Sequence, residues 1–163
     1  DPAARVVYVD NDPIVLAHAQ ALLRSTFEGS TDYVQADARE PGAIIEAAAR
    51  TLDLSRPVGL SLIALLHFLP DDDAHDTVDR LLAALAPGSY LVLSHATADF
   101  DPDNTARVLR VYRDRGVFLT VRSHAETSRF FTGLELVDPG LVPGVQWRPD
   151  PSSAPPGAGP TDL

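Results

Sequence analysis

The chain has 163 residues, 45% of them hydrophobic, which suits one domain with a proper core and makes two domains improbable. It has no cysteine, which excludes disulfides and thiolate metal sites, and its net charge of −10 disfavours nucleic-acid binding, because that requires clustered Lys and Arg. No apolar run approaches the roughly 18 residues that span a bilayer and no signal-like segment opens the chain, so we expect a cytoplasmic protein that binds no membrane.

The first predicted strand ends in an acidic residue. Residues 5–9 form a β-branched and aromatic run typical of a parallel sheet, and Asp10 would stand at its carboxyl end. Asp12 and Pro13 then start a helix that is expected to reach about Thr26. An acid in this place of an α/β sheet commonly binds the hydroxyls of a nucleoside ribose, so Asp10 is a candidate nucleoside ligand. The alternative is that Asp10 merely caps the turn.

The same strand-and-helix pattern continues through the next 60 residues or so. Residues 33–36 form a second strand that again ends in an acid, Asp37, and Pro41 opens a helix that fades near residue 51. The almost wholly apolar run 57–69 predicts a central strand that is covered on both faces and ends near His67. A helix marked by apolar positions 78, 81, 82 and 85 follows, and a fourth strand at 89–94 leads to His95.

This alternation predicts a doubly wound α/β fold with a mostly parallel sheet. A helix is expected at 105–115, and the spacing of Ser123 and Glu126 predicts a capping box at the start of a short helix. Residues 134–137 and 141–147 are interpreted as an antiparallel edge pair. Residues 150–163 are rich in Pro, Gly and Ser and are predicted to be disordered, which limits the domain to residues 1–149.

Two histidines are expected at the carboxyl ends of neighbouring strands. His67 and His95 are therefore the candidates for lining a substrate pocket and for acting as a catalytic base. The alternative is that backbone hydrogen bonds fix each histidine and neither takes part in a reaction. No metal site is predicted, because His95, Asp99 and Asp101 match no compact ligand pattern.

Several short motifs occur in one characteristic order along the chain. They are VYVDNDP at 7–13, an acid at 37, LHF at 66–68, LAPGSY at 85–90, SHAT at 94–97 and GLVP at 140–143. Together they resemble a class I S-adenosylmethionine-dependent methyltransferase, and more narrowly the bacterial family labelled S-adenosyl methyltransferase. The resemblance implies a Rossmann-like three-layer αβα fold, S-adenosylmethionine as the cofactor and a small molecule as the methyl acceptor.

The resemblance also implies which residues hold the adenosine part of the cofactor. Asp10 would accept hydrogen bonds from both ribose hydroxyls, and Asn11 would border the adenine. Asp37 would accept from the adenine amino group, with the backbone amide of Ala38 near a ring nitrogen. Cofactor-binding residues would then follow two successive strands.

The methionine part of the cofactor would be bordered by Leu66 and His67. The family's first strand and its glycine-rich loop must precede Asp10, where only nine residues stand. The missing strand would lie between the strands at 5–9 and 57–69. We therefore expect that this chain is the carboxyl-terminal portion of a longer methyltransferase, or that another polypeptide completes the sheet.

The function that this pattern favours is methyl transfer from S-adenosylmethionine to an unidentified small molecule. With half of the cofactor site absent, this portion can be inactive alone. One alternative is an NAD-linked oxidoreductase, because Asp10 would suit an NAD ribose equally well. The other is a non-catalytic fragment or binding domain of the same fold.

Overall fold

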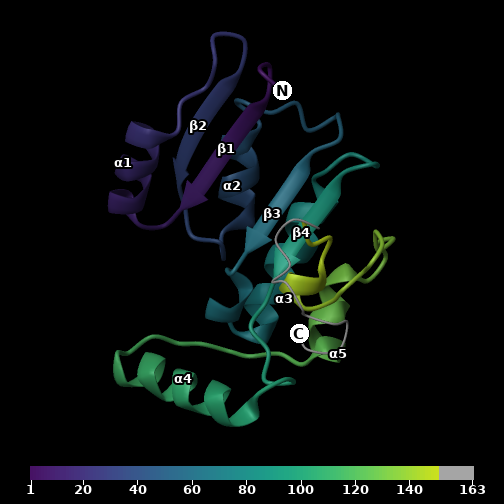
Figure 1. Cartoon of the computed structure of the whole chain (residues 1–163). Coiled ribbons are helices and arrows are strands. Elements are labelled where there is room, and N and C mark those ends of the chain that lie inside the picture. The colour runs from purple at the N-terminus through teal and green to yellow at the C-terminus, as the bar shows by residue number, and fades with distance from the viewer. Residues whose placement is uncertain (151–163) are drawn as a thin grey trace. The chain divides into compact units, whose positions relative to one another are not determined.

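The computed structural model describes residues 1–150, which divide into an N-terminal unit, Asp1–Leu93, and a C-terminal unit that begins at Ser94. The elements of the first unit follow in this order, with the strands and α-helices labelled in Figure 1: β1 (Arg5–Asp10), α1 (Pro13–Leu22), β2 (Ser30–Gln35), α2 (Pro41–Ala48), β3 (Gly59–Ile63), the 3-10 helix η1 (Leu66–Phe68), α3 (Asp71–Ala83) and β4 (Tyr90–Ser94), whose last residue opens the second unit. The predicted alternation of strands and helices is confirmed, since a helix stands between each strand and the next.

Strands β1 and β2 form a parallel pair, with Asp10 opposite Gln35 at its carboxyl end. Helix α1 begins where the sequence predicts, because the Asp12 side chain accepts a hydrogen bond from the Ile14 amide at 2.8 Å and Pro13 fills the first position. The helix ends at Leu22, earlier than expected, and the side chain of Leu22 is 80% exposed.

Strands β3 and β4 form a second pair, and their arrows point the same way in Figure 1. The predicted strand extending to His67 is wrong, because β3 ends at Ile63. The next residue, Ala64, has φ 53°, a left-handed conformation that cannot continue an extended strand. The chain then enters the single turn η1, which carries His67.

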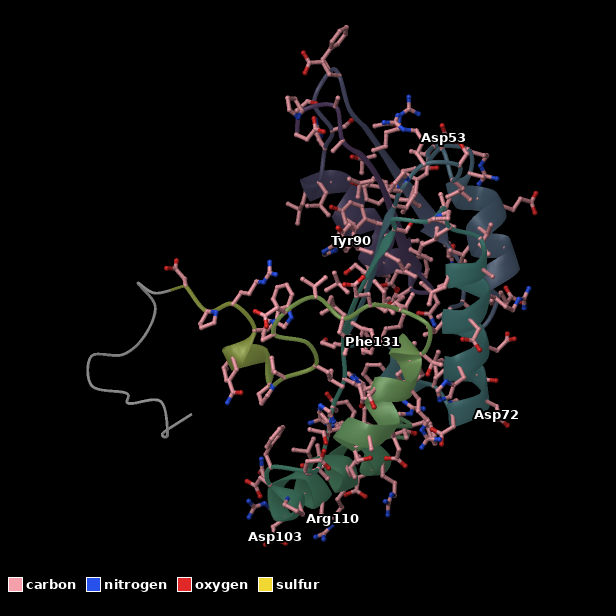
Figure 2. The ribbon with its side chains drawn as sticks, turned by 90° about the vertical axis from the view of Figure 1, so that its right-hand side faces the viewer. Asp53, Asp72, Tyr90, Asp103, Arg110 and Phe131 are labelled. Carbon is pink, nitrogen blue, oxygen red and sulfur yellow. The ribbon has the colours of Figure 1, made fainter. Side chains whose placement is uncertain are left out.

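The predicted burial of the central strand on both faces is also incorrect for the described residues. Leu62 is buried, whereas its neighbour Ile63 is 55% exposed. On β4, Tyr90 and Val92 are likewise exposed; Figure 2 labels Tyr90. Because successive side chains point to opposite faces, one face of this pair is covered and the other is open.

The two strand pairs are separate sheets, since no ladder joins β1 to β3 within residues 1–150. The Ala4 carbonyl accepts from the amide of Ser30, the first residue of β2, and the Asp10 carbonyl accepts from the amide of Ala36, directly after β2, each at 3.1 Å. Backbone groups alternate in direction along a strand, so the N–H and C=O of Val7 and Val9 face away from β2. The described fold is therefore α/β with two small parallel sheets.

The core of the N-terminal unit lies around helices α2 and α3, which contact each other. The apolar face of α3 is closed by Ala74, Val78 and Leu81, all of which are buried. Leu66 from η1 has no exposed surface. This core fixes the segment that follows β3.

The C-terminal unit contains α4 (Pro102–Asp114), α5 (His124–Ser128), η2 (Arg129–Phe131) and η3 (Gly144–Gln146). The capping box is confirmed, because Ser123 and Glu126 exchange backbone and side-chain hydrogen bonds at the start of α5. Helix α4 starts earlier than expected, since Asp101 accepts from the Asn104 amide at 3.0 Å. Asp103 and Arg110 project from this helix (Figure 2).

The predicted antiparallel edge pair is wrong, because residues 134–137 and 141–147 form no strand. Leu134, Leu136 and Val137 are exposed at 40%, 47% and 44%, and η3 occupies part of the second segment. Apolar alternation yields a strand only where another strand offers a pairing edge. Of the tail 150–163 that was predicted to be disordered, only Asp150 lies within the described residues.

Among residues 1–150, each helix is too short or too polar to cross a membrane.

Candidate functional site

The two acids predicted to bind a nucleoside lie at one edge of the same parallel pair. Asp10 is the last residue of β1 and is opposite Gln35, and Asp37 follows Gln35 by two residues. Because both strands run in the same direction, their carboxyl ends lie side by side. The structure thus brings together the two acids that stand far apart in the sequence.

One oxygen of Asp10 already caps the turn that follows β1. Its Oδ1 accepts a hydrogen bond from the Asp12 amide at 2.8 Å. Its Oδ2 has no hydrogen-bond donor within the part of the chain that the structure describes. The turn-capping role therefore uses one oxygen and leaves the other available for a ligand. The neighbouring Asn11 is exposed.

Asp37 is held by an arginine that the sequence analysis overlooked. Arg39 donates to its Oδ1 from the backbone amide at 2.9 Å and from Nε at 3.0 Å, and to its Oδ2 from Nη2 at 2.6 Å. These hydrogen bonds, first from the side chain and then from the backbone, lower the pKa of Asp37 from 3.8 to about 2. Asp37 is consequently a fixed negative charge. In the sequence, the Asp-x-Arg spacing directly after a strand is the feature that could have indicated this pair.

The loop after β2 is tied to helix α3 by a buried hydroxyl. Thr77 is 1% exposed, and its Oγ1 donates to the carbonyl of Ala38 at 3.0 Å. This bond fixes the peptide next to the Ala38 amide, which the resemblance places near the adenine. A threonine among the apolar positions of α3 is the sequence signal for such a contact.

Leu66 and His67 differ in what they offer a ligand. The Leu66 side chain is fully buried and supports the core. His67 is half-buried, and its ring packs against that of Phe68 with centroids 4.5 Å apart. The left-handed Ala64 that precedes them is the kind of backbone strain that clusters at functional sites.

His95, in the C-terminal unit, has both ring nitrogens engaged. Its Nδ1 lies 2.8 Å from the Ala96 carbonyl oxygen and its Nε2 lies 2.6 Å from Nη1 of Arg122. Arg122 is 3% exposed, and sequence reasoning missed it because its partner stands 27 residues away. One backbone group and one side chain therefore fix the orientation of the ring.

The acids near His95 serve as caps. Asp99 accepts from the amide of His124, the first residue of α5, at 2.7 Å. Asp101 caps α4. Within residues 1–150, no three His, Asp or Glu side chains are grouped so as to hold a metal ion.

Comparison with solved structures identifies similar folds in two bacterial proteins. A DUF574 family protein from Streptomyces avermitilis MA-4680 has 51% sequence identity and a TM-score of 0.88 over 93% of this chain and 59% of its own. A provisionally named methyltransferase from Thermobifida fusca YX has 37% identity and a TM-score of 0.78 over 96% of this chain and 60% of its own.

Curated proteins with similar sequences carry related names. A Mycobacterium avium (strain 104) protein, provisionally named an S-adenosyl-L-methionine-dependent methyltransferase, is 28% identical over 162 residues, which are 94% of this chain and 50% of that protein. A carboxy-S-adenosyl-L-methionine synthase from Chromohalobacter salexigens is 38% identical over 72 residues, 44% of this chain and 26% of that protein. The chain thus spans half or less of the length of these curated relatives.

The family model described as S-adenosyl methyltransferase matches residues 1–160, which is nearly the whole chain. The resemblance inferred from the ordered motifs is confirmed by this match. The chain belongs to the S-adenosyl methyltransferase family.

Proposed function

We propose that this chain is part of an enzyme that transfers a methyl group from S-adenosylmethionine to a small molecule, and that the N-terminal unit holds the adenosine half of the cofactor. The observation that carries the proposal is the in-register parallel pair β1–β2, from whose ends Asp10 and Asp37 emerge together. The family match supports the same cofactor.

The adenosine would be held by groups that the fold has already oriented. The Oδ2 of Asp10 would accept from the ribose hydroxyls, while its Oδ1 keeps the turn in place. Asn11 would border the adenine. Asp37 would accept a further hydrogen bond from the adenine amino group beside those from Arg39, because each carboxylate oxygen can accept more than one hydrogen bond. The Ala38 amide, steadied through its own carbonyl by Thr77, would face a ring nitrogen.

Methyl transfer requires mainly that the protein position the reacting groups. The sulfonium of the cofactor supplies an already activated methyl group, so the protein's contribution is to align acceptor, methyl and sulfur. We propose that His67, in the turn after β3, borders the methionine part of the cofactor. For His95, directly after β4, we propose a contact with the methyl acceptor. Leu66 would act from the core by holding the turn that carries His67.

We also propose that a strand from outside these residues pairs with both β1 and β3, supplied by a preceding segment or by another chain. On β1, the backbone groups of Val7 and Val9 face away from β2. Just before β3, the Val58 carbonyl accepts from the Tyr90 amide at 3.0 Å, so Val58 faces β4. Because backbone groups alternate in direction along a strand, the N–H and C=O groups of Gly59 and Ser61 face away from β4. Each such group costs about 1–3 kcal/mol if it is buried without a partner.

Calorimetry on the full-length gene product tests the proposed function. We expect S-adenosylmethionine and S-adenosylhomocysteine to bind and NAD to give no heat of binding. Binding of NAD alone would favour the oxidoreductase alternative. Binding of none of the three would leave a non-catalytic domain and would overturn the proposal.

The role of Asp10 is tested by two variants of that product. Asp10→Ala removes both oxygens and is expected to weaken binding of S-adenosylhomocysteine by about 5- to 150-fold, which corresponds to about 1–3 kcal/mol. Asp10→Asn keeps an oxygen for the Asp12 amide, so it separates the turn from the ribose contact. Unchanged affinity in both variants would return Asp10 to its turn-capping role.

A further inference from the structure

A buried arginine lies beside His95 and is used by nothing in the proposed function. Arg122 is 3% exposed and packs over the ring of Phe130, with its guanidinium carbon 5.4 Å from the ring centroid. Phe130 is itself 2% exposed, and the His95 ring stacks on it at 6.1 Å with an interplanar angle of 21°. The guanidinium and the imidazole thus share one aromatic support.

The hydrogen-bond partners of His95 determine where its proton lies. A carbonyl oxygen can only accept, so the Nδ1 facing Ala96 at 2.8 Å must carry the hydrogen. A guanidinium can only donate, so the Nε2 facing Nη1 of Arg122 at 2.6 Å must accept. An imidazole that donates from Nδ1 and accepts at Nε2 is neutral.

The backbone reinforces this arrangement. The amide of Arg122 donates to the carbonyl of Ala96 at 3.1 Å, the same oxygen that accepts from His95. One peptide oxygen therefore binds the histidine ring and anchors the residue that donates to the other side of that ring. A second proton on Nε2 would remove the lone pair that accepts the hydrogen bond from Arg122, so protonation of His95 would break that bond.

We infer that Arg122 is a positioning residue that holds His95 as the neutral Nδ1–H tautomer and occupies its Nε2 lone pair. The relevance to methyl transfer rests on the proposed function, in which His95 borders the acceptor pocket. While the Arg122 bond is intact, His95 orders that border and does not take a proton from the acceptor.

Nuclear magnetic resonance of the ¹⁵N-histidine-labelled full-length protein tests this inference without any cofactor. The signals of His95 are identified as those lost in His95→Gln. We expect a two-bond ¹H–¹⁵N correlation spectrum at neutral pH to show a protonated Nδ1 and an accepting Nε2. An Nε2–H tautomer or an imidazolium would overturn the inference, even if no variant of Arg122 folds.

Variants then assign the effect to Arg122. Arg122→Met removes the donor and is expected to give a mixture of both His95 tautomers, whereas Arg122→Lys retains a donor and is expected to keep more of the Nδ1–H form. Arg129→Met is the control, because Arg129 is 64% exposed and pairs with Glu126. An unchanged His95 pattern in folded Arg122→Met would contradict the inference. Because the experiment needs no cofactor, its outcome is independent of the calorimetry.

Discussion

Arg39 donates three hydrogen bonds to the Asp37 carboxylate, one from its backbone amide and two from Nε and Nη2 of its guanidinium group. The pair lies within a single loop, so its geometry does not depend on a distant element. Charge-assisted hydrogen bonds of this kind favour the ionised acid. The acid at the end of β2 therefore carries its negative charge before any ligand arrives.

Replacing Arg39 should remove the hydrogen bonds that lower the pKa of Asp37. In Arg39→Met, we expect the pKa of Asp37 to rise from about 2 toward 3.8, because the hydrogen bonds from the Arg39 side chain are the main cause of the low pKa. A pKa that is lower in the folded state stabilises the fold above the unfolded value, and this contribution is lost as the pH falls from about 4 toward 2. Carboxyl ¹³C titration of wild type and variant measures the change.

The control for this titration is Arg50→Met, which removes an exposed arginine just after α2. The pKa of Asp37 should stay near its wild-type value there. An Asp37 that titrates identically in wild type and Arg39→Met would show that the loop does not hold this pair in solution.

The sequence predicted best those features that a few neighbouring residues decide. Asp12 and Pro13 define the start of α1, and Ser123 and Glu126 define the capping box, because a cap is a contact over two or three residues. The positions of Asp10 and Asp37 followed from the strand ends. Local chemistry was sufficient in each of these cases.

Features that depend on distant partners were beyond the sequence pattern. The apolar run into Leu66 gave no sign that the strand stops at Ile63, since a buried turn and a buried strand are equally apolar. Arg122 could not be recognised because its partner, His95, belongs to another segment. The segment 134–137 alternates like a strand, but pairing requires an edge that its own residues do not encode.

Thr77 offers a test of the bond that steadies the loop after β2. Thr77→Val keeps the shape but removes the hydroxyl, which leaves the Ala38 carbonyl without this donor in the core. We expect a loss of about 1–3 kcal/mol in the free energy of unfolding, measured by urea denaturation. Thr77→Ser keeps the hydroxyl and should lose less. Equal losses in both variants would point to packing as the only role of Thr77.

Leu66 should matter for stability and not directly for ligand contact. Leu66→Ala empties a site with no exposed surface, and losses of about 2–5 kcal/mol are typical of such changes. Leu22→Ala, at a side chain that is 80% exposed, should stay within about 0.5 kcal/mol of wild type. Urea denaturation followed by circular dichroism compares the two. A mild effect of Leu66→Ala would mean that η1 is not anchored in the core.

Asp12 and Asp10 stand next to the same turn but should respond to different measurements. Asp12→Ala removes the acceptor for the Ile14 amide, so we expect the free energy of unfolding to fall by about 1 kcal/mol while the affinity of the full-length protein for S-adenosylhomocysteine stays close to wild type. Asp12→Ser retains a capping oxygen and should recover most of the stability. Asp10→Asn should show the opposite pattern, with stability kept and affinity lost. If Asp12→Ala weakens binding as strongly as Asp10→Asn, the helix start and the ribose contact cannot be separated, and the assignment of one acid to each task fails.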